Sequence, residues 1–165
     1  MFNQMNQSLP ISTLGRTGFK VSRLGYGTAF SKRPDEIPWG SLLNEVLDSG
    51  INLIDTANDY GVGMGLPAEE VIGKYISNRR SEFFLATKCG CAPMDRVNSN
   101  GGHVWTRENA YRGLYESLER LNTDYIDIMQ YHNPTVDDVE NGDLIEVLNS
   151  MREEGKVRGI GISTT

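Results

Sequence analysis

Several polar side chains that can do chemistry stand directly after apolar runs in this sequence. Asp55 follows "INLI", Lys88 follows "FFLAT" and His132 follows "YIDIMQY". Tyr60 comes shortly after Asp55, and Ser163 closes the run "VRGIGI". Each apolar run is separated from the next by about the length of one strand and one helix. If the runs form parallel neighbouring strands, their carboxyl ends lie at one edge of the sheet and the polar side chains converge there.

The types of these residues suit proton transfer. We expect Asp55 and Lys88 to meet as an ion pair on adjacent strands, because each charge then reduces the desolvation cost of the other. An ammonium beside the phenol of Tyr60 favours its phenolate form. A phenol that exchanges a proton near neutral pH can serve as a general acid or base. His132 is expected to donate a hydrogen bond into the same pocket, where it would orient or polarise a carbonyl. We therefore predict a catalytic site of Asp55, Tyr60, Lys88 and His132.

Each of these residues has an ordinary structural interpretation when it is taken alone. A charge at a strand end is commonly a solvated rim charge, a single histidine such as His132 is usually structural, and a loop tyrosine such as Tyr60 most often packs on a helix. Four such residues at successive strand ends favour the functional interpretation, because ionisable groups with perturbed proton affinity gather at active sites.

Other patterns in the chain are weaker. Cys89 and Cys91 could hold zinc together with His132, but no fourth ligand is evident, so we predict no metal site. The glycine-rich stretch of residues 61–65 lacks the spacing of a dinucleotide fingerprint and does not open directly from a strand. We interpret it as a flexible lid over the pocket mouth. The loop from Cys91 to Trp105 is expected to border the substrate site, with Trp105 as an apolar wall or as a buried packing residue.

Strands and helices alternate along the chain. The segment "LGRTGFKVSRLGYGT" predicts a hairpin with a turn at Thr17-Gly18 that continues into a first strand. Apolar side chains at helical spacing predict helices over residues 38–49, 68–77 and 144–154, and a helix capped by Thr106 that reaches Leu121. The short apolar runs "INLID", "FFLATK", "YIDIMQYH" and "VRGIGIS" predict the strands between and after them.

These strands are nearly continuous apolar runs, which is typical of a parallel sheet covered by helices. The alternation alone does not separate a flat, doubly wound sheet from a closed barrel. The polar residues at the strand ends favour the barrel, because active sites of such barrels are built at the carboxyl ends of the strands. The expected fold class is therefore α/β, of the (β/α)8 TIM-barrel type.

The composition is that of a globular protein without a surface for nucleic acid. The chain has 165 residues, of which 38% are hydrophobic, and a net charge of −6, so no basic stripe is available to neutralise phosphates. No stretch reaches the roughly 20 apolar residues that cross a bilayer, and the start of the chain lacks the pattern of a secretory signal. Cys89 and Cys91 stand too close for a bridge. We predict a cytoplasmic protein with reduced thiols and no membrane partner.

Taken together, these motifs resemble those of the aldo-keto reductases, NAD(P)H-dependent oxidoreductases with a (β/α)8 barrel. "DTANDYG" is similar to the family's Asp-Thr-Ala-x-x-Tyr-Gly motif, and "LATKCG" and "IMQYHNP" are similar to the passages that hold its catalytic lysine and histidine. "LGRTGFKVSRLGYGTAF" resembles the family's amino-terminal hairpin and first strand, and "EEGKVRGIGIST" its passage from the fourth helix to the fifth strand. The resemblance runs from about Leu14 to the last residue.

The resemblance implies a role for each residue of the predicted catalytic site. Tyr60 would donate the proton to the carbonyl of a small aldehyde, ketone or sugar, with Asp55 and Lys88 favouring its phenolate. His132 would orient the carbonyl oxygen while hydride arrives from NADP or NAD. The resemblance leaves the particular substrate, and the choice between NADP and NAD, undecided.

The resemblance also implies a set of cofactor-binding residues. Gly27, Thr28 and Asp55 would form the floor under the nicotinamide ribose, and Ser163 would bind the carboxamide. Thr164 stands where the family commonly has Asn, and we assign it to the same site.

The chain is short for such a barrel, which typically needs about 250 residues. We expect one domain over residues 1–165, with 1–13 as a flexible leader, truncated at the carboxyl end after a hairpin and about four and a half βα units. The last strand would form an open edge, through which copies of the chain could self-associate. The alternative to an enzyme is a catalytically incompetent fragment or half-barrel that acts as a binding module.

Overall fold

A computed structural model describes residues 9–29, 37–92 and 102–164, and in it two sheets form. The smaller is an antiparallel hairpin of β1 (Ile11–Thr13) and β2 (Lys20–Ser22). The larger is a parallel sheet in which spatial order equals sequence order, as expected of successive βα units. Its strands are β3 (Tyr26–Gly27), β4 (Leu53–Asp55), β5 (Phe84–Cys89), β6 (Ile126–His132) and β7 (Val157–Ser163).

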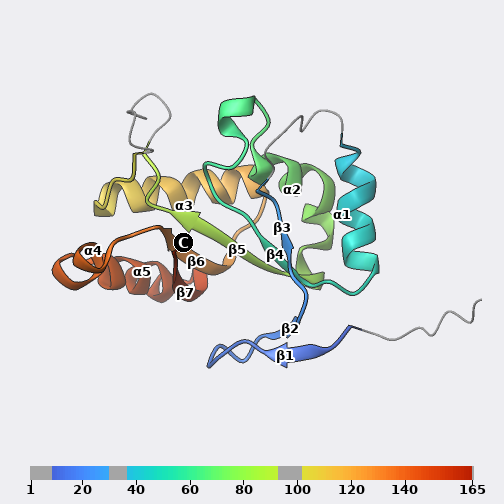
Figure 1. Cartoon of the computed structure of the whole chain (residues 1–165), viewed down its shortest axis with the longest axis horizontal. Coiled ribbons are helices and arrows are strands. Elements are labelled where there is room, and N and C mark those ends of the chain that lie inside the picture. Colours follow the sequence, from blue (N-terminus) through green and yellow to red (C-terminus); the bar gives the residue numbers. More distant parts are fainter. Residues whose placement is uncertain (1–8, 30–36, 93–101, 165) are drawn as a thin grey trace, which may run out of the picture.

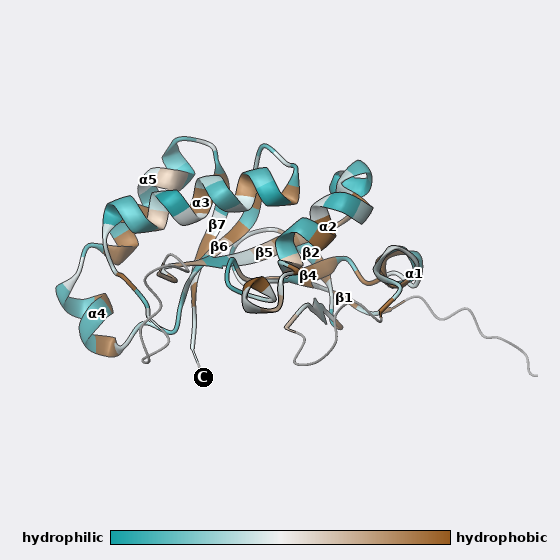
Figure 2. Cartoon of the chain, turned by 90° about the horizontal axis from the view of Figure 1, so that it is seen from above, coloured by the Kyte–Doolittle hydropathy of each residue, from teal (hydrophilic) through white to brown (hydrophobic). Residues whose placement is uncertain are grey.

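Helices connect the successive parallel strands. They are α1 (Trp39–Asp48), α2 (Ala68–Ile76), which continues into the 3₁₀ helix η3 (Ser77–Glu82), α3 (Arg107–Leu121) and α5 (Leu144–Glu153). Figure 2 shows α1, α2, α3 and α5 in an arc along one side of the strands. The predicted helices are confirmed to within a residue at each end. The predicted α/β class is also confirmed, and the arrangement is consistent with part of a (β/α)8 barrel.

The core lies between the helices and the sheet. Successive side chains of a strand point to opposite faces, so on β5 Leu85 and Cys89 face the helices, whereas Lys88 faces the other side. The helices contribute their apolar stripes to this layer, and each fully buried aliphatic side chain contributes about 1.5–3 kcal/mol. The helical residues of the core include Leu43, Leu47, Val71, Ile72, Leu114, Leu118, Val147 and Leu148.

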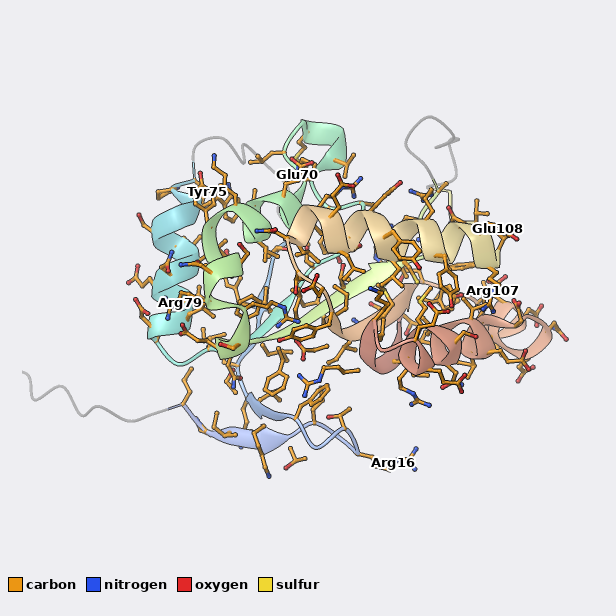
Figure 3. All side chains as sticks on the ribbon, turned by 180° about the vertical axis from the view of Figure 1, so that it is seen from behind. Arg16, Glu70, Tyr75, Arg79, Arg107 and Glu108 are labelled. Atoms are coloured by element: carbon orange, nitrogen blue, oxygen red, sulfur yellow. The ribbon has the colours of Figure 1, made fainter. Side chains whose placement is uncertain are left out.

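Contacts on the outer surface fix the helices to one another. Arg79, labelled in Figure 3, lies in η3. Its Nη1 donates to Oδ1 of Asn44 on α1 at 3.0 Å, and its Nη2 lies 2.8 Å from Oδ1 of Asp48. Gly40 of α1 packs against Tyr75 of α2, because a Cβ added at Gly40 would lie 3.0 Å from the tyrosine ring. These contacts join α1 to α2 and to η3, which follows it.

The predicted leader differs from what is observed. The sequence predicted a flexible leader over residues 1–13, but Ile11–Thr13 forms strand β1 and pairs with β2; residues 1–8 lie outside the described part. The hairpin extends away from the helix layer, as Figure 1 shows.

Two short helical segments were not predicted. The helix α4 (Val136–Asn141) follows β6, and the stretch interpreted as a lid contains a 3₁₀ helix, η2 (Val62–Met64), flanked by left-handed glycines. Within the described ranges, no helix is both long enough and apolar enough to cross a bilayer.

Candidate active site

Three of the predicted catalytic residues stand at the carboxyl ends of three adjacent strands. Asp55 ends β4, Lys88 is the penultimate residue of β5 and His132 ends β6. The strands pair in register, with Asp55 opposite Ala86 and Lys88 opposite Gln130. Tyr60 follows β4 in a turn closed by its own backbone N–H, which donates to the carbonyl of Ala57 at 3.2 Å.

The buried ammonium of Lys88 has two acceptors. Its Nζ donates to Oδ1 of Asp55 at 2.7 Å and to the backbone carbonyl of Thr56 at 2.8 Å. The ion pair predicted between Asp55 and Lys88 is therefore confirmed. A buried ammonium is tolerated only when acceptors replace its water, and these two oxygens do so.

The aromatic members of the site lie against this ammonium. Nζ of Lys88 is 4.9 Å from the centroid of the Tyr60 ring, and the rings of Tyr60 and His132 meet edge to face with centroids 5.8 Å apart. The structure thus brings all four predicted residues into one cluster. A positive charge within about 6 Å of an aromatic ring is attracted to its face, which helps to hold Tyr60 in place.

The Nδ1 atom of His132 contacts two side chains outside the four-residue cluster. It lies 3.3 Å from Sγ of Cys91 and 3.5 Å from Oδ1 of Asp59. Burial lowers the pKa of His132; the carboxylate of Asp59 acts against this shift, and the ammonium of Lys88 reinforces it. With Nδ1 in contact with these groups, Nε2 is the nitrogen that remains for other contacts.

Cys91 and Cys89 have different surroundings. Burial raises the pKa of the Cys91 thiol, and the nearby Asp59 raises it further, so this side chain is a neutral thiol at neutral pH. Burial raises the pKa of Cys89 to about 12, and Cys89 packs in the core with the helices. Only Cys91 of the pair therefore lies beside His132.

Sequence reasoning missed two neighbours of His132. Asp59 lies inside the quoted "DTANDYG" motif but was given no role, although its carboxylate is 3.5 Å from Nδ1 of His132. The ring of His103 lies edge to face with that of His132, with centroids 5.4 Å apart. Trp105, predicted either to wall the site or to pack, stacks on His103 and also contacts Tyr131.

The predicted cofactor residues lie on both sides of the cluster at the same end of the sheet. On the β3 side, Gly27 pairs with Asp55 in register, and the N–H of Thr28 donates to the carbonyl of Asp55 at 2.9 Å. A Cβ added at Gly27 would meet nothing within 4 Å, so the space beside this backbone is open. On the β7 side, Ser163 pairs with His132 in register, and the exposed Thr164 follows it.

The larger cavities lie elsewhere. One of about 650 Å³ is lined by residues of α2 and α3, including Glu70 and Arg120, and one of about 680 Å³ is lined by residues that include Trp39 and Tyr75. None of the four clustered residues lines either cavity. A smaller cavity of about 140 Å³ is lined in part by Asp59 and Cys91, the two residues that contact Nδ1 of His132, but not by His132 itself.

Comparison with known proteins places the chain in a family. The model of the aldo/keto reductase family matches residues 23–165. The chain belongs to this family. Among curated aldo/keto reductase relatives, it is 36% identical over 153 residues to the uncharacterized oxidoreductase YqkF of Bacillus subtilis, with 92% of this chain and 47% of the relative covered. It is 32% identical over 177 residues to L-galactose dehydrogenase of Arabidopsis thaliana, with 94% of this chain and 48% of that enzyme covered.

A solved structure agrees with the family assignment. The aldo-keto reductase AKR11C1 of Bacillus halodurans, in its holo form, superposes with a TM-score of 0.81 at 32% identity. The alignment covers 94% of this chain and 50% of that structure. The chain therefore spans about half the length of these three relatives, and over that half it has the aldo/keto reductase arrangement of strands and helices.

Proposed function

We propose that this chain carries the catalytic residues of an NAD(P)H-dependent oxidoreductase that interconverts a carbonyl compound and an alcohol. The observation that supports this most directly is the placement of Lys88. Its Nζ is 2.7 Å from Oδ1 of Asp55 and 4.9 Å from the centroid of the Tyr60 ring. The positive charge of Lys88 therefore lies beside the phenol ring of Tyr60, and that ring also contacts the ring of His132.

In this proposal Tyr60 is the general acid and base. When the phenol of Tyr60 gives its proton to a carbonyl oxygen, negative charge develops on the phenol oxygen, and the ammonium of Lys88 stabilises that charge. Asp55 keeps Lys88 oriented. His132, whose Nδ1 is engaged by Cys91 and Asp59, would present Nε2 to the carbonyl oxygen and hold it near the phenol.

In this proposal a nicotinamide cofactor binds along the same carboxyl-terminal end of the sheet. NADP or NAD would supply or accept the hydride. Gly27, Thr28 and Asp55 would bind it on the β3 side, where the backbone of Gly27 is open to solvent space. Ser163 and Thr164 would bind it on the β7 side. Together these residues would set the cofactor beside the carbonyl.

The proposed substrate is a small aldehyde, ketone or sugar. One relative at 32% identity is named L-galactose dehydrogenase, which supports a sugar among the candidates. The cytoplasm is the proposed location, and the two free, buried cysteines are compatible with a reducing compartment.

Substitution of the general acid tests the proposal. The Tyr60→Phe variant should lose about 10²- to 10⁴-fold in carbonyl reduction, while binding of NADPH or NADH, followed by fluorescence quenching, stays unchanged. Tyr115→Phe is the matched control, because Tyr115 is an exposed tyrosine on α3, and it should keep the wild-type rate. Equal rates for the two variants would contradict the role of Tyr60.

A half-barrel that acts as a binding module is the second candidate. Strand β7 pairs with β6 on one side and, among the described strands, with nothing on the other. Its Ile162 is 36% exposed. An unpaired apolar edge invites pairing with another chain, so we propose self-association through β7. The mass of the 165-residue chain in solution should then rise with concentration, and Ile162→Lys should reduce the rise. A monomer at every concentration would refute this.

A further inference from the structure

Three side chains that commonly bind metals converge behind the proposed active site. One ligand atom from each of Cys91, His103 and His132 lies within 4.8 Å of the other two. The three residues come from separate segments: Cys91 follows β5, His103 precedes α3 and His132 ends β6. Cys91 and His132 are buried and His103 is half-buried, so the cluster is shielded from bulk water.

We propose that Cys91, His103 and His132 form a zinc-binding site. One thiolate and two imidazoles make a ligand set that suits Zn²⁺, which binds cysteine sulfur and histidine nitrogen in a tetrahedral arrangement. The sequence alone predicted no metal site, because no fourth ligand was evident beside Cys89, Cys91 and His132. In the structure His103, rather than Cys89, joins Cys91 and His132.

The distances are close to those that zinc requires. With Zn–S near 2.3 Å, Zn–N near 2.0–2.1 Å and tetrahedral angles, sulfur and nitrogen ligands should lie roughly 3.6 Å apart. Sγ of Cys91 and Nδ1 of His132 are 3.3 Å apart. These two atoms therefore need only a small adjustment to share an ion, and the third ligand atom, within 4.8 Å of both, needs a modest side-chain movement.

The backbone holds Cys91 and His103 opposite one another. The two residues form an antiparallel β-bridge. Hydrogen bonds flank it, from the N–H of Ala92 to the carbonyl of Gly102 at 2.7 Å and from the N–H of Val104 to the carbonyl of Gly90 at 2.8 Å. A ligand pair fixed in this way loses little conformational entropy when the metal binds.

Side chains from α3 reinforce the same bridge. Asn109 donates from Nδ2 to the carbonyl oxygens of both Cys91 and Val104, at 3.1 and 2.9 Å. Arg112 donates from Nη2 to the carbonyl of Cys91 at 2.8 Å. The ring of His103 stacks on Trp105, with centroids 5.2 Å apart and an angle of 7° between the planes. Supporting contacts of this kind orient metal ligands and raise affinity.

The imidazole of His103 has an unsatisfied nitrogen. Its Nε2 is buried and, among the described residues, has no hydrogen-bond partner. Buried polar atoms nearly always have a partner, and an exception calls for a missing water or ion. A zinc ion bound in the cluster would coordinate this imidazole, so Nε2 would no longer lack a partner.

The surroundings can accept the charge of the ion and leave a fourth position. The carboxylate of Asp59, 3.5 Å from Nδ1 of His132, provides negative charge next to the site. Asp59 and Cys91, though neither histidine, also line the cavity of about 140 Å³, and a water molecule held there beside Cys91 would serve as the fourth ligand. On binding, the Cys91 thiol releases its proton to solvent and forms a zinc–sulfur bond as thiolate. No oxidant or reductant is needed.

Metal titration of the intact chain tests the proposal and does not depend on the proposed function. After treatment with a chelator, zinc affinity is measured by competition with a chromophoric chelator, and Co²⁺ is added separately to look for the near-ultraviolet absorption of a cobalt–thiolate bond. We expect one Zn²⁺ per chain and a cobalt–thiolate band. Absence of binding at micromolar concentrations, or a cobalt spectrum without that band, would overturn the proposal.

Three variants locate the site. Cys91→Ala should abolish the cobalt–thiolate band, and His103→Gln should weaken zinc binding by at least about tenfold, the effect expected even for loss of a supporting residue. Cys89→Ala is the matched control, because Cys89 is equally buried but lies outside the cluster, and it should bind zinc as the wild type does. Circular dichroism checks that each variant folds. If His103→Gln binds as tightly as Cys89→Ala, the assignment is wrong.

Discussion

The ion pair between Lys88 and Asp55 is unequal in burial. Nζ of Lys88 lies 2.7 Å from Oδ1 of Asp55, yet the side chain of Lys88 is 4% exposed and that of Asp55 is 44% exposed. Water can therefore reach the carboxylate but not the ammonium. The two residues should contribute differently to stability, although both belong to the same proposed site.

We predict that Asp55→Ala destabilises the fold more than Lys88→Met does. The first change leaves a buried ammonium with only the carbonyl of Thr56 as acceptor, which should cost about 3 kcal/mol. The second removes the buried charge and leaves a carboxylate that water can solvate, so its cost should stay within about 1 kcal/mol. Urea unfolding midpoints at equal m-values measure both. The prediction fails if the two variants unfold together or in the reverse order.

Asp127 should contribute to the free energy of unfolding, but we expect it to have no role in the proposed active site. It lies near the amino end of β6, and its oxygens accept from Nη2 of Arg80 and Nη1 of Arg158, each at 2.6 Å, and from the N–H of Leu85 at 2.9 Å. Asp127→Ala would leave the buried N–H of Leu85 without its acceptor and the largely buried guanidinium of Arg80 without its carboxylate, and should cost about 3 kcal/mol. Asp124→Ala, at an exposed position nearby, should stay within about 0.5 kcal/mol. Similar unfolding midpoints for the two variants would show that the network carries little energy.

The buried carboxyl of Glu69 should make the folded chain less stable as pH rises, which is the opposite of the usual effect of a carboxyl group. Burial raises its pKa, while the hydrogen bond from Thr87 and the charge of Arg120 act against this shift. The folded chain then binds the proton more tightly than the unfolded chain. The Glu69 contribution to the free energy of unfolding is thus full below the ordinary pKa and is lost as pH rises through the raised pKa.

The Glu69→Gln variant tests this sign. The amide oxygen can still accept from Oγ1 of Thr87, which is 2.7 Å from Oε1 in the wild type, but the variant has no charge to desolvate. We expect the free energy of unfolding of Glu69→Gln, relative to wild type, to increase with pH between about 4 and 7. Urea titrations across that range measure the difference. A difference that is constant or decreases with pH would contradict the account.

Much of the fold could be predicted because strand ends and helix faces leave local patterns. Thr106 caps α3 by accepting from the N–H of Asn109 at 3.2 Å, as its position before an apolar helical stripe indicated. The meeting of Asp55 and Lys88 followed from parallel adjacent strands. The helix α4 was missed because it is short and has no buried residues. Its only signal was the capping box of Thr135 and Asp138.

The position of His103 could not be predicted for a different reason. It reaches the site through its β-bridge to Cys91 and through the side chains of Asn109 and Arg112 on α3. Such tertiary contacts leave no periodic pattern. Cys89 and Cys91 looked equivalent in sequence, because residues two apart on a strand face the same side. Strand β5 ends at Cys89, and the left-handed Gly90 (φ 94°) that follows separates the cysteine in the core from the one beside His132.

Transfer of deuterium tests the central proposal most directly. The chain is incubated with NADPH or NADH deuterated at the reactive carbon and with a small aldehyde, and the alcohol is analysed by mass spectrometry. The account predicts one deuterium on the carbinol carbon with wild type and with Tyr115→Phe, and about 10²- to 10⁴-fold slower labelling with Tyr60→Phe. Labelling by Tyr60→Phe at the wild-type rate, or no labelling by the wild type while it binds the cofactor, would contradict it.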